Sequence, residues 1–199
     1  MKIFVNFLSA FRIAAAFAII PTIMLGWHWV TFIIYALAAI SDWFDGFLAR
    51  KYNCCSKLGG VLDHIGDKLL VCNAFIMLIL LFPVPLIVIP IIIMIARELY
   101  ISGLREFLGT QKIEMPVPKA RFSMGKIKTT IQMLATAVLF LFMAVGSLIT
   151  PSTNSEIIFI LISVLPQIGI FCIWFALIAS IWSATQYTIT FAQKLKKIK

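Results

Sequence analysis

The segment from Asp42 to Lys68 reads DWFDGFLARKYNCCSKLGGVLDHIGDK and holds four of the eight acidic residues of the chain. Asp42 and Asp45 lie near the end of one apolar run, and Asp63 and Asp67 lie near the start of the next. The segment that joins the two runs is short, which predicts that they form antiparallel neighbouring helices.

Helical spacing places each pair of aspartates on one side of its helix. At about 100° per residue, Asp45 is about 60° from Asp42, and Asp67 is about 40° from Asp63. The two pairs also lie at similar heights above the connecting segment. We therefore expect the four carboxylates to face one another at one level of the helix pair.

Four carboxylates at this depth need a cation. An ionised side chain inside a membrane costs a few kcal/mol and usually marks a functional site. The nearby bases Arg50 and Lys68 are fewer than the acids, and clustered carboxylate oxygens suit Mg²⁺ or Mn²⁺. We predict a divalent metal site. The small residues beside the aspartates fit either close approach of a ligand or tight helix packing: Gly46, Ala49, Gly59 and Gly60.

The whole chain has the composition of a membrane protein. Of 199 residues, 62% are hydrophobic and 13% are charged, against about 25% charged in soluble domains. Six apolar runs are each long enough to cross a bilayer, which takes about 20 residues. They predict an all-α, polytopic, single-domain protein (1–199) whose first span stays uncleaved. The runs are 7–26, 30–50, 58–81, 85–107, 124–148 and 157–191.

The basic residues predict the orientation of these spans. Nearly all Lys and Arg residues fall in or beside segments that share one side of the membrane, whereas the loops on the other side have none. The positive-inside rule then puts both termini in the cytoplasm. The net charge of +9 fits contact with anionic lipids and requires no nucleic acid partner. The basic segments are 1–6, 50–58, 107–124 and 192–199.

Residues 42–67 resemble the signature of the CDP-alcohol phosphatidyltransferases, D-x2-D-G-x2-A-R-x8-9-G-x3-D-x3-D, at every fixed position. Further likeness to family members that use glycerol 3-phosphate lies in 96–106, 125–133 and 182–187, so the resemblance covers essentially the whole chain. One departure is His64, where such members usually have proline.

The resemblance implies an enzyme of phospholipid biosynthesis in the bacterial cytoplasmic membrane, with its active site facing the cytoplasm. It would transfer the phosphatidyl group of CDP-diacylglycerol to glycerol 3-phosphate, as a homodimer. Asp42, Asp45 and Asp63 would bind two Mg²⁺ or Mn²⁺ ions, and Asp67 would complete the site and act as general base. The residues implied for CDP-diacylglycerol are Asn6, Gly46, Ala49, Arg50, Ser56 and Gly59.

A phosphate-bearing acceptor needs converging basic residues. Arg105 is our first choice because a guanidinium binds phosphate bidentately, and it shares a helix side with Glu98 and Ser102. An ion pair with Glu98 or a lipid headgroup contact would explain Arg105 equally simply. The other candidates are Arg97, Arg121, Lys126 and Lys128.

Two other functions remain open at this point. A related transferase with another acceptor, such as a cardiolipin synthase that uses phosphatidylglycerol, would share the same signature. A divalent-cation transporter would also carry acids inside the membrane. The outer halves of the predicted spans are almost uniformly apolar, which disfavours a transporter.

Overall fold

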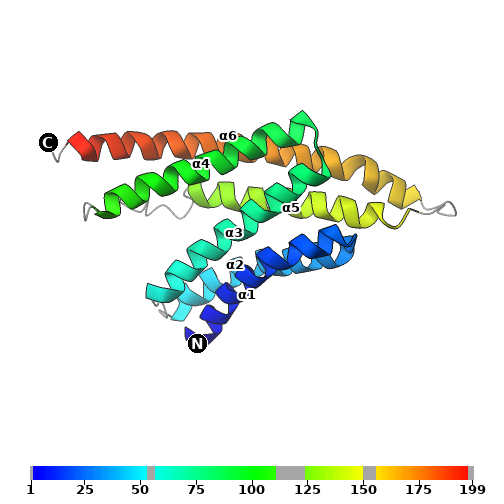
Figure 1. Cartoon of the computed structure of the whole chain (residues 1–199), viewed down its shortest axis with the longest axis horizontal. Helices are drawn as coiled ribbons and strands as arrows, with labels where there is room; N and C mark the ends of the chain where they lie inside the picture. The colour runs from blue at the N-terminus through cyan, green and yellow to red at the C-terminus, as the bar shows by residue number, and fades with distance from the viewer. Residues whose placement is uncertain (1, 53–56, 111–123, 150–155, 197–199) are drawn as a thin grey trace.

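The structure, a computed structural model, describes residues 2–52, 57–110, 124–149 and 156–196, with side chains at 7–42, 65–110, 128–149 and 156–195. The described residues form six helices, so the all-α prediction is confirmed, and each apolar run falls largely within one helix, with ends that differ by up to about five residues (Figure 1). The helices are α1 (Lys2–Met24), α2 (His28–Tyr52), α3 (Lys57–Leu81), α4 (Pro85–Thr110), α5 (Met124–Gly146) and α6 (Glu156–Lys196).

Local sequence signals explain where α1 ends and where α4 begins. Gly26 has a φ of 74°, a conformation that glycine adopts without steric cost. Its N–H donates to the Ile23 carbonyl, and the Trp27 N–H donates to the Thr22 carbonyl at 2.8 Å. This is the Schellman arrangement that closes a helix and reverses the chain. Pro85 then begins α4, a position where its missing N–H costs nothing.

The helices have lengths and surfaces suited to a bilayer. In the described part of the chain, four segments are long and apolar enough to cross a membrane: Phe7–Met24, Pro85–Thr110, Lys128–Gly146 and Glu156–Leu195. Large apolar side chains such as Leu99, Phe171 and Ile178 are more than 60% exposed. Lipid is the solvent in which such a surface is stable. The 41 residues of α6 span about 60 Å, twice the hydrocarbon core.

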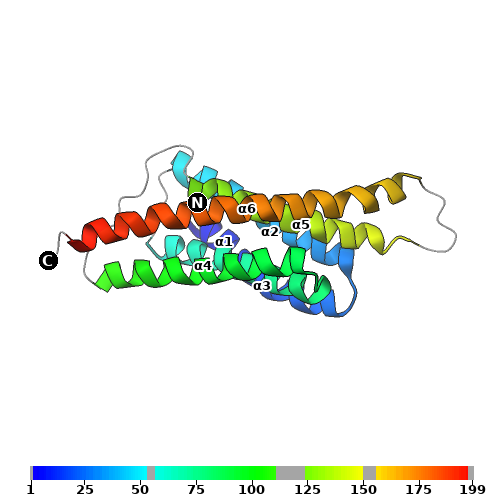
Figure 2. The same cartoon turned by 90° about the horizontal axis from the view of Figure 1, so that it is seen from above.

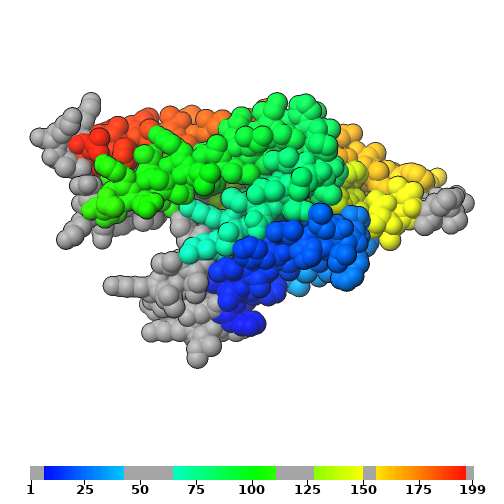
Figure 3. All heavy atoms as spheres, viewed as in Figure 1, coloured from blue at the N-terminus to red at the C-terminus, as the bar shows by residue number. Residues whose placement is uncertain are grey.

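The helices form two groups of three. α1 packs against α2 and α3, and α6 packs against α4 and α5 (Figures 1 and 2). α2 also packs on α5, where the rings of Tyr35 and Phe140 meet edge to face with centroids 5.1 Å apart. Both side chains are fully buried. Figure 3 shows a notch between the C-terminal end of α4 and the nearby end of α3.

The α5–α6 contact depends on Gly169. A Cβ added at Gly169 would lie 2.5 Å from Cδ2 and 2.7 Å from Cγ of Leu139, whose side chain is buried. We expect Gly169→Ala to lower stability by about 1–3 kcal/mol through overpacking. Thermal unfolding of the detergent-solubilised protein measures this change. Gly109→Ala is the matched control, because a Cβ there meets no atom within 4 Å. Equal unfolding temperatures for the two variants would contradict the prediction.

Candidate active site

An acidic site lies where α1, α2 and α3 meet. The Nη1 atom of Arg12, on α1, donates to Oδ1 of Asp42 on α2 at 3.1 Å, and also pairs with Oδ1 of Asp67 on α3. The side chain of Arg12 is 0% exposed, whereas those of Asp42 and Asp67 are 31% and 25% exposed. One buried cation therefore joins two half-buried carboxylates from two other helices.

Close packing of α1 on α3 sets this geometry. A Cβ at Gly66 would lie 3.4 Å from the Ser9 carbonyl oxygen and 3.5 Å from Cβ of Arg12. Gly66 thus lets α1 approach α3 directly beside Asp67. Further along the same interface, Nδ2 of Asn73 donates to the Ala16 carbonyl at 2.9 Å. These contacts fix the position from which Arg12 reaches the carboxylates.

The donor set of the acidic site fits a hard divalent cation. Two carboxylate oxygens converge on one positively charged atom, and oxygen ligands of this kind suit Mg²⁺ or Mn²⁺. Among the side chains that the structure describes, no three His, Cys, Asp or Glu residues form a metal-binding group. The predicted ligands Asp45 and Asp63 lie outside the described side chains, so a four-carboxylate site stays a prediction.

Sequence reasoning overlooked Arg12 as a counter-charge. The prediction weighed the aspartates against Arg50 and Lys68, but the structure adds Arg12 from α1. An arginine inside an apolar run is itself a signal, because such a charge needs a partner. The remaining predicted residues lie outside the described side chains: Asn6, Gly46, Ala49, Arg50, Ser56, Gly59, Arg121 and Lys126, together with His64.

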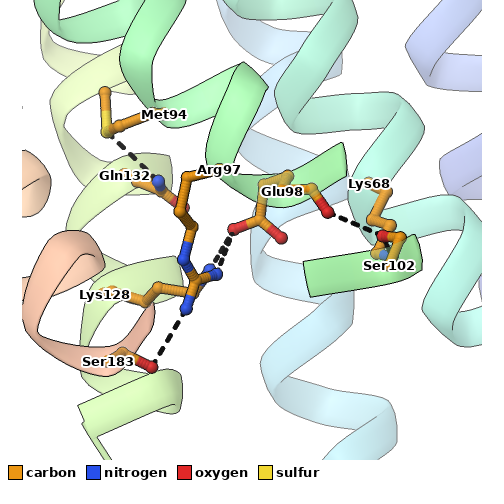
Figure 4. Close-up of polar contacts among 8 residues, drawn as sticks. All are labelled: Lys68, Met94, Arg97, Glu98, Ser102, Lys128, Gln132 and Ser183. Carbon is orange, nitrogen blue, oxygen red and sulfur yellow. Dashed lines mark hydrogen bonds and ion pairs between the residues drawn. The ribbon is translucent and has the colours of Figure 1, made fainter. Parts of the chain in front are cut away.

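A basic cluster lies between α4, α5 and α6 (Figure 4). Arg97 and Lys128 both pair with Oε1 of Glu98, Arg97 through Nη1 at 2.9 Å. Nη2 of Arg97 also donates to Oγ of Ser183 on α6 at 3.1 Å. Lys128 is 6% exposed. The predicted phosphate ligands Arg97 and Lys128 are therefore brought together, around one carboxylate.

Lys68 links the basic cluster to the acidic site. It follows Asp67 in the sequence, and its Nζ donates to Oγ of Ser102 on α4 (Figure 4). Ser102 lies one helical turn after Glu98, to whose carbonyl its hydroxyl donates at 2.7 Å. Consecutive residues of α3 thus contact the acidic site and the edge of the basic cluster.

Arg105 borders the same cluster. Its guanidinium lies over the ring of Tyr187 on α6, 5.4 Å from the centroid, and the side chain is exposed. Arg105 lies about two helical turns after Glu98, on the same side of α4. The cluster therefore combines several cations with the carboxylate of Glu98, an arrangement suited to a bound anion.

The fold and these two sites define an all-helical membrane protein with charged clusters of opposite sign inside its bundle. Residues 2–182 match the CDP-alcohol phosphatidyltransferase family, and the chain belongs to this family. The sequence resemblance is therefore confirmed.

Several bacterial relatives carry the name CDP-diacylglycerol–glycerol-3-phosphate 3-phosphatidyltransferase. The protein from Rickettsia bellii is 36% identical over 189 residues, which is 92% of this chain and 91% of the relative. The protein from Sodalis glossinidius is 33% identical over 185 residues, again 92% of this chain and 91% of the relative. The protein from Cereibacter sphaeroides is 37% identical over 142 residues, 68% of this chain and 62% of the relative.

The basic cluster should depend on the charge of Glu98. In Glu98→Gln, Arg97 and Lys128 keep a neutral acceptor but lose their shared carboxylate, so we expect a loss of about 2 kcal/mol. The thermal unfolding temperature should fall by about 4–8 °C for a chain of this length. Glu106→Gln removes an exposed carboxylate from the same helix and serves as the control. A variant at Glu98 as stable as the one at Glu106 would refute this expectation.

Proposed function

We propose that this protein transfers the phosphatidyl group of CDP-diacylglycerol to glycerol 3-phosphate, releasing CMP and phosphatidylglycerophosphate. The observation that carries the proposal is the adjacency of the acidic site to the basic cluster across Asp67 and Lys68. One substrate brings a diphosphate that needs cations, and the other brings a phosphate that needs basic side chains. The names of relatives aligned over nine tenths of the chain agree with this assignment.

The acidic site would hold the metal-dependent part of the reaction. Asp42 and Asp67, with Asp45 and Asp63, would hold two Mg²⁺ or Mn²⁺ ions. Bound there, the ions would neutralise the diphosphate of the donor and the charge that develops on CMP. The carboxylate of Asp67 would accept the proton of the acceptor 1-hydroxyl as its oxygen bonds to the phosphatidyl phosphorus and the bond to CMP breaks.

The basic cluster would bind the acceptor. Arg97 presents a guanidinium for bidentate contact with the phosphate of glycerol 3-phosphate, and Lys128 adds a point charge. Arg105, held over Tyr187 at the edge of the cluster, would contribute a third cation. Glu98 already keeps Arg97 and Lys128 close together. The acceptor hydroxyl would then lie toward Asp67, because Lys68 and Ser102 join the two sites.

The same proposal includes six membrane spans with both termini in the cytoplasm. Each of the six helices has at least 23 residues, more than a span needs. With six crossings, the basic segments and the active site share the cytoplasmic side of the bacterial inner membrane. The CDP moiety would bind at Asn6, Gly46, Ala49, Arg50, Ser56 and Gly59. A homodimer is proposed on family resemblance.

Loss of the proposed base should abolish turnover. Asp67→Asn keeps the size of the side chain but cannot accept the proton, so we expect CMP release to fall by at least about 10²-fold. The measurement is CMP release by purified enzyme from CDP-diacylglycerol and glycerol 3-phosphate with Mg²⁺ or Mn²⁺. Glu106→Gln should keep wild-type activity. Near-normal turnover by the Asp67 variant would rule out this role.

Removal of a cation from the basic cluster should affect the acceptor selectively. For Lys128→Met we expect the KM for glycerol 3-phosphate to rise by about tenfold or more, because a charge-assisted contact to phosphate is lost. The KM for CDP-diacylglycerol should change little. Initial rates with each substrate varied in turn give both constants. Product formed with phosphatidylglycerol but not with glycerol 3-phosphate would replace the proposal with a cardiolipin synthase.

A further inference from the structure

Arg12 is a charge buried in an apolar helix. Its side chain has no exposure to solvent, and the neighbours of Arg12 on α1 are apolar residues such as Phe11 and Ile13. A buried guanidinium in such surroundings is stable only when opposite charges contact it. Those charges come from Asp42 and Asp67, on two other helices. The acidic site therefore contains a cation that the chain itself supplies.

We propose that Arg12 is the internal counterion of the metal-free site and competes with the divalent metal for Asp42 and Asp67. The role of Arg12 would be to hold α1, α2 and α3 together before metal binds, at the expense of metal affinity. The inference rests on the proposed metal site but not on the identity of the acceptor or on the reaction.

The contacts of Arg12 place it in competition with a metal ion for the same oxygens. One atom, Nη1, contacts an Oδ1 atom of each carboxylate, so a metal ion that takes these oxygens needs the space or the lone pairs that Arg12 uses. Like charges a few ångströms apart also repel strongly away from water. The Arg12 backbone lies close to α3, because a Cβ added at Gly66 would be 3.5 Å from Cβ of Arg12. Lys68, the neighbouring cation, is engaged by Ser102.

Because of thermodynamic linkage, this competition predicts that Arg12 raises the stability of the protein without metal and lowers its affinity for metal. An interaction that stabilises the metal-free protein but is weakened by metal must reduce metal affinity by the same free energy. Removal of the arginine should therefore destabilise the protein without metal and tighten metal binding. A residue that only packs, or only organises the ligands, would not give this combination of signs.

The experiment compares wild type with Arg12→Gln in detergent. Thermal unfolding is recorded in EDTA, and Mn²⁺ affinity is measured by electron paramagnetic resonance of the free ion. We expect Arg12→Gln to unfold about 4 °C or more below wild type in EDTA. We expect its Mn²⁺ dissociation constant to be at least about fivefold lower. Arg105→Gln is the matched control, since Arg105 stacks on Tyr187 at a different site, and its Mn²⁺ affinity should equal that of wild type.

A double variant separates charge from packing. Asp42→Asn added to Arg12→Gln removes one of the two carboxylates that lose their cation, so stability in EDTA should rise above that of Arg12→Gln. If Arg12→Gln does not fold, the double variant decides: a folded double variant in EDTA supports the proposal, and an unfolded one overturns it. Unchanged or weaker Mn²⁺ binding by folded Arg12→Gln would also overturn it.

These measurements use no lipid substrate. Failure of the enzyme to release CMP with glycerol 3-phosphate would refute the proposed function while leaving the Arg12 result intact. Conversely, normal turnover with unchanged Mn²⁺ affinity in Arg12→Gln would refute the role of Arg12 alone.

Discussion

Charges buried among apolar helices must be matched by opposite charges on neighbouring helices, and the rest of this structure depends on that constraint. Arg12 brings α1, α2 and α3 to one point through Asp42 and Asp67. Glu98 does the same for α4 and α5 through Lys128, and Arg97 extends the contact to α6. These ion pairs add to van der Waals packing in lipid, where the hydrophobic effect does not drive helices together because acyl chains are as apolar as leucine.

The two ion clusters also explain the division of the bundle. Each cluster joins the three helices of one group, and α3 connects the groups because Asp67 belongs to one cluster while Lys68 contacts the edge of the other. The two charged clusters are therefore linked through α3.

Local signals made the helices predictable, whereas contacts between distant segments were not. Gly26 and Pro85 mark helix boundaries by their own backbone chemistry, so the sequence places these breaks within a few residues. Helical spacing correctly grouped Glu98 with Ser102, which belong to one helix. It could not show that Lys128 approaches from α5, or Arg12 from α1, because one helix face carries no information about which neighbour covers it. For the same reason, the comparison of the aspartates with nearby bases in the sequence left out Arg12.

Each cluster contains one side chain whose charge has the same sign as the ligand proposed for that cluster. Arg12 supplies a cation among carboxylates, and Glu98 supplies an anion among cations. In each cluster this charge offsets part of the repulsion among like charges in a low-dielectric interior, where an unpaired ion costs several kcal/mol. Under the proposed function, the metal and the acceptor phosphate would replace ion pairs that already exist in the protein. They would not bind to unpaired charges. Affinity for each ligand is then lower than the raw attraction suggests, which favours release of product over tight binding of substrate.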